Sequence, residues 1–181
     1  MIIAREKRAS NIAEYILYLW QIEDLLRAMD FDLEKVSQKL VSQYEANPDL
    51  KLEIFDWYAG LIQSMKEENI IKSGHLQYLD ALVEELNDFH FRLIDSPHHA
   101  DYQKKYWDAV YNISDFRKKM PVREKIGDIE VALTVLYGLL LMRMKKKTVS
   151  HDTLEAIESI RDLVALLSDK YRDYEEGRIE V

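Results

Sequence analysis

Charged residues interrupt the apolar faces of two predicted helices, and these residues are the best suited to chemistry. Asp24 and Arg27 are three positions apart, a spacing that allows an ion pair on one helix face. Asp56 lies between aromatic residues further along the chain and is followed by Trp57. His75 follows a Ser-Gly pair at a predicted helix start, where free backbone N–H groups can hold an anion. If the helices that carry them are neighbours, these five residues line one polar pocket.

Two interpretations of this pocket stay open. It would serve a small-molecule sensor or an enzyme with an acidic pocket around Asp24, Asp56 and His75, because paired acids need no linear motif for acid–base chemistry. It would equally be a structural network of ion pairs that fixes the register of the helices. An open pocket lined by these residues would favour the first interpretation. Direct ion pairs among them would favour the second.

The histidines do not predict a metal site. His75 and His90 are 15 residues apart on one predicted helix, which is about 22 Å at 1.5 Å per residue. His98 and His99 are adjacent, and adjacent side chains on a helix diverge by about 100°. His90 falls within an apolar stripe, so we interpret it as a hydrogen-bonded core residue. We expect no metal, no cofactor and no catalytic residue.

The elements that must position these residues are helices. Apolar residues recur at spacings of three and four, which is typical of amphipathic helices. The pattern predicts helices over about residues 11–28, 33–46, 49–68, 75–95, 97–119, 127–145 and 151–173. Asp32, Ser96 and Ser150 are the expected N-caps, and Pro97 follows Ser96 at a first helical position. The sequence therefore predicts an all-α fold, a single compact bundle of six to seven helices.

Length and composition agree with this fold. A chain of 181 residues suits one domain, 1–181, with charged and frayed ends at about 1–8 and 175–181. The chain has only 5 Gly and 3 Pro, which favours long helices joined by few turns. It has no Cys, which excludes disulfides and thiolate metal sites.

Charge and hydropathy limit the partners. The chain carries 25 Lys and Arg against 33 Asp and Glu, a net charge of −8, whereas nucleic-acid binding needs a basic surface. The longest uncharged stretch, residues 131–142, has twelve residues, fewer than the roughly 20 that span a membrane. The first residues do not resemble a signal peptide. We expect a cytoplasmic protein that binds neither nucleic acid nor membrane.

The function that these patterns favour is binding without catalysis. The sequence has no glycine-rich phosphate loop, no Gly-x-Ser-x-Gly and no His-Glu-x-x-His. Its 11 Tyr and 3 Trp suit an aromatic interface as well as a core. We therefore expect a homo-oligomer, or a protein that binds a protein or small-molecule partner. An apolar face left exposed on the predicted helix 97–119 or 151–173 would favour oligomerisation.

Three segments carry a resemblance to a known family. Residues 11–27 read NIAEYILYLWQIEDLLR, residues 56–58 read DWY, and residues 73–77 read SGHLQ. The chain resembles, over most of its length, an uncharacterised family of small cytosolic proteins found mainly in Bacteroidetes. The resemblance implies a soluble, all-helical bacterial protein and supplies no activity, cofactor or catalytic residue.

Overall fold

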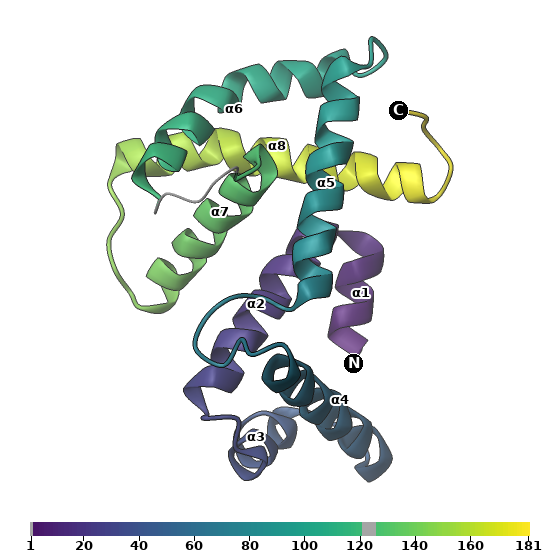
Figure 1. The fold of residues 1–181 in the computed structure, drawn as a ribbon, viewed down its shortest axis with the longest axis vertical. Helices are drawn as coiled ribbons and strands as arrows, with labels where there is room; N and C mark the ends of the chain where they lie inside the picture. Colours follow the sequence, from purple (N-terminus) through teal and green to yellow (C-terminus); the bar gives the residue numbers. More distant parts are fainter. Residues whose placement is uncertain (1, 121–125) are drawn as a thin grey trace. The chain divides into compact units, whose positions relative to one another are not determined.

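The computed structural model describes residues 2–120 and 126–181. All the regular secondary structure of these residues is helical (Figure 1). The helices are α1 (Ile2–Ser10), α2 (Ile12–Ala28), α3 (Leu33–Lys39), α4 (Pro48–Glu67), α5 (Gln77–Asp95), α6 (Ala100–Lys119), α7 (Asp128–Met144) and α8 (His151–Glu175), with a 3₁₀-helix at Val41–Gln43. The predicted all-α fold is confirmed.

The predicted count of six to seven helices is wrong, because the described residues form eight α-helices. The additional helix is α1, which lies where the sequence predicts a frayed end. Four of its nine residues are charged and it shows no long apolar period, so the pattern did not indicate a helix. Ala4 is nevertheless buried, and Lys7 forms an ion pair of 2.6 Å with Glu14 at the start of α2. Basic residues in the last turn of α1 also complement the helix dipole.

The described chain divides into two compact units. One comprises Met1–Ala9 and Glu14–Asp80, and the other comprises Ser10–Ala13 and Ala81–Val181. A compact unit is not necessarily a domain that folds by itself. The single domain 1–181 therefore stays a prediction.

The first unit contains most of α2 together with α3 and α4. Asp32 caps α3 as predicted, because its side chain accepts hydrogen bonds from the backbone N–H groups of Glu34 and Lys35. This helix ends earlier than expected and gives way to the 3₁₀-helix. Asn47 then caps α4, whose first residue is Pro48, a position where the missing N–H of proline costs nothing.

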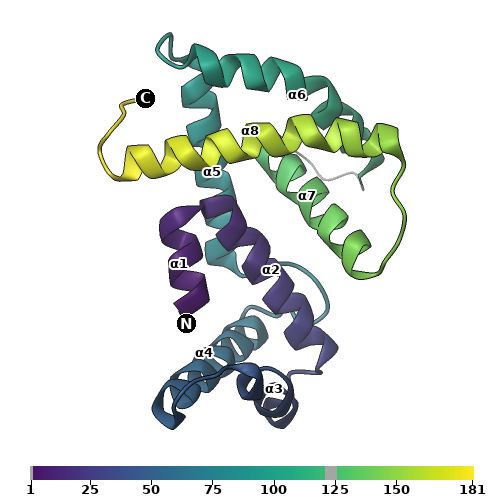
Figure 2. The ribbon, with the colours of Figure 1, turned by 180° about the vertical axis from the view of Figure 1, so that it is seen from behind.

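In the second unit α6, α7 and α8 pack against one another, which Figure 2 shows from behind. Ser150 caps α8 as predicted. The cap predicted at Ser96 is wrong: α6 begins at Ala100 with His99 as its N-cap, after a turn in which His99 donates its backbone N–H to the carbonyl of Ser96. Within residues 2–120 and 126–181, no helix combines the length and the apolar character needed to cross a membrane.

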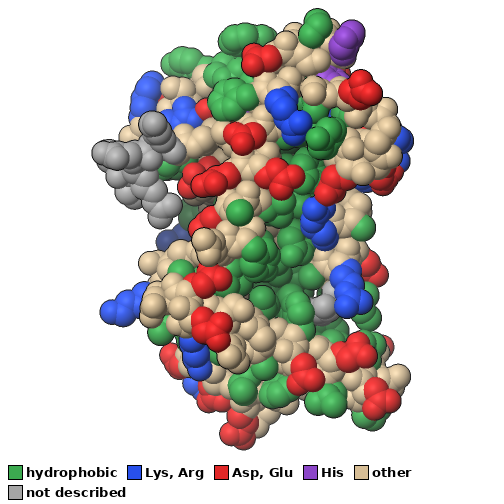
Figure 3. Space-filling view, turned by 45° about the vertical axis from the view of Figure 1, so that its right-hand side comes forward, with side chains coloured by type: hydrophobic (Ala, Val, Ile, Leu, Met, Phe, Trp, Pro, Cys, Tyr) green, Lys and Arg blue, Asp and Glu red, His purple; other side chains and the backbone are tan. Residues whose placement is uncertain are grey.

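Charged side chains of both signs are interspersed over the face of the molecule that Figure 3 shows. Ion pairs between residues three positions apart on one helix also occur in the described chain. On α8, for example, Arg161 lies 2.9 Å from Glu158, and Arg172 lies 3.1 Å from Asp169. Such exposed pairs contribute less than about 1 kcal/mol each to stability.

Candidate functional site

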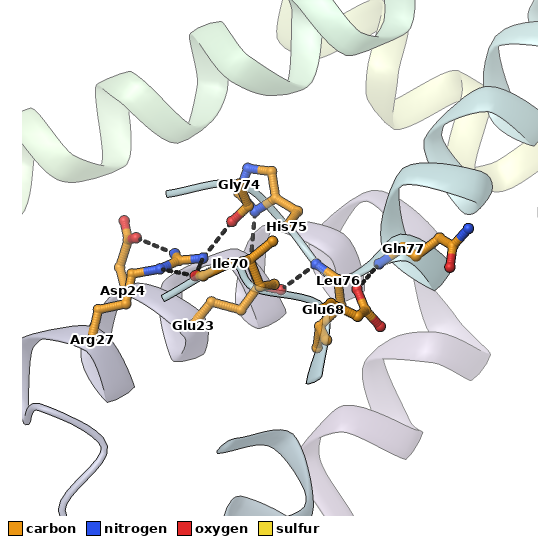
Figure 4. Close-up of polar contacts among 9 residues, drawn as sticks. All are labelled: Glu23, Asp24, Arg27, Glu68, Ile70, Gly74, His75, Leu76 and Gln77. Atoms are coloured by element: carbon orange, nitrogen blue, oxygen red, sulfur yellow. Dashed lines mark hydrogen bonds and ion pairs between the residues drawn. The ribbon is translucent and has the colours of Figure 1, made fainter. Parts of the chain in front are cut away.

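A polar network joins α2 to residues 70–77, the segment that leads from α4 into α5, and all of it lies in the first unit (Figure 4). The α2 residues Trp20, Glu23, Asp24 and Arg27 are spaced three or four apart, so they share one face of the helix. This face meets the segment through side chains that bond mostly to its backbone.

Glu23 is the most buried charged residue of the network, with 1% of the residue exposed. Its Oε2 lies 2.6 Å from Nδ1 of His75, and its Oε1 accepts the backbone N–H of Leu76 at 2.9 Å. A buried carboxylate is costly unless donors satisfy its oxygens, and here each oxygen has one. An ionised carboxylate only accepts hydrogen bonds, so with Glu23 ionised the donor of this contact is Nδ1 of His75.

Arg27 holds the other end of the segment. Its Nε and Nη2 donate to the carbonyl of Ile70 at 3.2 Å each, and Nη2 also donates to the carbonyl of Gly74. Nη1 forms an ion pair of 2.9 Å with Asp24. Gly74 has a φ of +97°, which residues with a side chain rarely adopt, so glycine suits this turn. The guanidinium group of Arg27 therefore holds the turn through the backbone carbonyls of Ile70 and Gly74.

Two carboxylates also satisfy the start of α5. The first backbone N–H groups of a helix have no partner within it, and negative charge near them is favourable. Leu76 donates its N–H to Glu23, and Gln77 donates its N–H to Glu68 at 2.7 Å. The predicted helix start near His75 is thus made by acids from α2 and from the end of α4.

His75 lies against Trp20, with ring centroids 4.3 Å apart and ring planes 17° from parallel. Its side chain is 29% exposed. Glu23 orients the ring through Nδ1, as carboxylates do for histidines that work through their other nitrogen. The contact with Glu23 leaves the other ring nitrogen, Nε2, for a hydrogen bond or a proton transfer.

The structure brings together three of the five predicted site residues. Asp24, Arg27 and His75 belong to the network, whereas Asp56 is exposed on α4 and the ring of Trp57 packs edge-on against Tyr58. No hydrogen bond or ion pair joins Asp56 to this network among the described residues.

The buried side of α4 lies away from Asp56. The sequence predicts an apolar stripe on this helix that includes Ile54, Trp57, Leu61 and Met65. Ile54 and Met65 are buried, but the other buried positions are Tyr58 and Ile62, in place of Trp57 and Leu61. Asp56 is exposed, outside this buried side.

The residue that sequence analysis missed is Glu23. Glu23 lies three residues after Trp20 and four residues before Arg27, so it shares their helix face. This spacing is the one signal in the sequence that could have found it. The contacts of the network are direct, between charged side chains and backbone. They favour the structural interpretation of Asp24 and Arg27.

A second polar cluster lies in the other unit and centres on His90, which is fully buried. Its Nδ1 lies 2.6 Å from the hydroxyl of Tyr102, so the predicted hydrogen-bonded core histidine is confirmed. Its Nε2 lies 3.8 Å from Oδ2 of Asp128, beyond hydrogen-bond distance, and this oxygen accepts a hydrogen bond from Tyr106 at 2.9 Å. Arg117 donates to the other oxygen of Asp128.

The charges of this cluster favour the ionised form of Asp128. The contact with His90, then the hydrogen bonds from Arg117 and Tyr106, hold the pKa of Asp128 well below its usual range, although burial opposes this. Burial and the bond to Asp128 raise the pKa of Tyr106 to about 12. The cluster joins α5, α6 and α7. Groups of three or more potential metal-ligating side chains are not found in the described part of the chain.

We expect Glu23→Gln to lower the free energy of unfolding by about 1–3 kcal/mol, because one of its buried donors loses a charged acceptor. Urea unfolding measures this change. Asp24→Asn is the matched control, since Asp24 is 46% exposed and its pair is worth less than about 1 kcal/mol. Equal losses in the two variants would contradict the assignment of Glu23 as the centre of the network.

We expect Asp128→Asn to lower stability by about 2 kcal/mol at neutral pH. The pKa of Asp128 is lower in the folded state, so its contribution is complete above the unfolded value of about 4 and is lost as the pH falls further. Unfolding of both proteins at a series of pH values tests this. A difference between them that stays constant into strong acid would contradict it, and Asp115→Asn, on an exposed pair with Lys118, is the control.

Comparison with known proteins completes the description of this site. No curated protein and no solved structure matches the chain. One family model matches residues 1–178, nearly the full length, and it confirms the resemblance to an uncharacterised family. The chain belongs to the family described as a domain of unknown function (DUF4924).

Proposed function

We propose that the protein works by binding another protein chain through the outer face of α6, without catalysis. The observation that supports this is a pair of exposed aromatic side chains one helical turn apart. Trp107 is 67% exposed and Tyr111 is 72% exposed. Aromatic side chains of this size dominate the binding energy of protein interfaces.

The inner face of α6 explains why these rings face outward. Tyr102, Ala109 and Ile113 are buried against the rest of the unit. Lys105 and Asn112 bond across to α8, at 2.9 Å from Asp162 and 2.9 Å from Ser159. The helix is therefore anchored on one side, and the opposite side presents its aromatic residues on a rigid element.

From the sequence we expect that an extended apolar face left exposed on the predicted helix 97–119 would favour oligomerisation. The two exposed rings support a binding role for this helix. The proposal also includes the predicted cytoplasmic location. A net charge of −8 makes nucleic acid an unfavourable partner.

The alternative proposal is a small-molecule sensor or an enzyme that uses His75. The orientation of its ring by Glu23 supports it, but an acidic pocket would need Asp24 and Asp56, and these do not converge. A small molecule that native mass spectrometry finds on wild-type protein from its own host, and not on His75→Gln, would favour this alternative.

We expect a photo-crosslinking residue at position 111 to capture a protein chain in cells, because Tyr111 lies within the proposed interface. The same residue at position 52 is the control, since Leu52 is 60% exposed but lies on α4. Mass spectrometry identifies the captured chain. Trp107→Ser should abolish the crosslink. No capture above the level at position 52, or capture that Trp107→Ser leaves unchanged, would overturn the proposed function.

A further inference from the structure

The outer face of α6 carries two opposite charges beside its exposed rings. Lys104 and Asp108 are both exposed and are four residues apart, so they lie one turn apart on the face that carries Trp107 and Tyr111. The order along the helix is thus a cation, an aromatic ring, an anion and a second aromatic ring. The two ends of this surface therefore differ in charge, with a cation toward the N-terminus of the helix and an anion toward its C-terminus.

A surface of this kind is complementary to itself when it is turned end to end. In a two-fold interface the same patch is used by both copies, and residue i meets residue j while residue j meets residue i. If two copies of α6 run antiparallel about an axis near position 106, each Lys104 comes opposite Asp108 of the other copy. The same axis brings the two Trp107 rings about 3 Å out of step along the helices, because each lies one residue from it.

Other registers of the same pair are less favourable. An axis near position 108 would place Asp108 of one copy opposite Asp108 of the other copy, and like charges in contact repel. A parallel pair in register would do the same to both Lys104 and Asp108. Charge complementarity therefore favours the axis near position 106 over these two registers.

We propose that the chain bound by the outer face of α6 is a second copy of this protein, in an antiparallel two-fold dimer in which Lys104 pairs with Asp108 of the other copy. This inference rests on the proposed function and names its partner. The contact is small, so the dimer is weak and forms reversibly with protein concentration. The net charge of −8 on each copy opposes association at low salt, which further favours a reversible dimer.

Charge exchange tests the pairing, with sedimentation velocity over a range of protein concentrations as the measurement. Lys104→Glu should weaken the dimer by about tenfold or more, because it sets two pairs of acids against each other. The double variant Lys104→Glu and Asp108→Lys should restore it, since the exchanged pairs are again complementary. Lys118→Glu, on the same helix, makes the same change in net charge and is the control.

Cysteine crosslinking tests the direction, because the chain has no cysteine of its own. Protein with Lys104→Cys is mixed with protein with Asp108→Cys and oxidised. The mixture should give a disulfide-linked pair of the two variants, with one Lys104–Asp108 pair kept intact. A product that links Lys104→Cys only to itself would indicate a parallel pair and overturn the inference.

The outcomes separate this inference from the function on which it rests. A dimer that requires Trp107 but ignores the charge exchange would overturn the antiparallel pairing and leave the interface. A protein that stays monomeric at all concentrations, while position 111 captures a different protein in cells, would overturn the second copy as partner and leave the proposed function. A monomer without any capture would overturn both.

Discussion

A carboxylate that is withdrawn from water must find donors, and in the first unit this requirement falls on Glu23. Its ionised form in the interior would cost several kcal/mol without partners. The ring of His75 and the backbone of Leu76 supply the two donors, and both belong to the segment that precedes α5. Together with Arg27 and Glu68, this buried acid fixes the position of that segment on α2 and the start of α5.

The second unit meets the same requirement at the start of another helix. Asp128 is the first residue of α7, where negative charge is favourable, and it also receives donors from α6. His90 from α5 completes the cluster. In both units an acid at a helix N-terminus joins elements that are distant in sequence. These polar contacts therefore specify which apolar helix faces pack against each other.

The surface proposed for binding lies on α6, a helix that contacts within the second unit hold in place. Its inner side is held by buried apolar residues and by polar bonds to α8, so its outer side is presented without a need to reorganise. A preordered surface loses little conformational entropy when it binds. The rings of Trp107 and Tyr111 are therefore more suited to an interface than similar residues on a loop would be.

The sequence by itself determined the helical fold, because the spacing of apolar residues and the caps at Asp32 and Ser150 are local properties. It also placed Asp24 and Arg27 as a pair and His90 in the core, since a single helix face defines both. It did not find α1, whose short, charged segment has no apolar period. It did not find the role of Glu23 either. The partners of a buried acid and the exposure of Asp56 and Trp107 depend on which helices meet, and only the tertiary structure decides that.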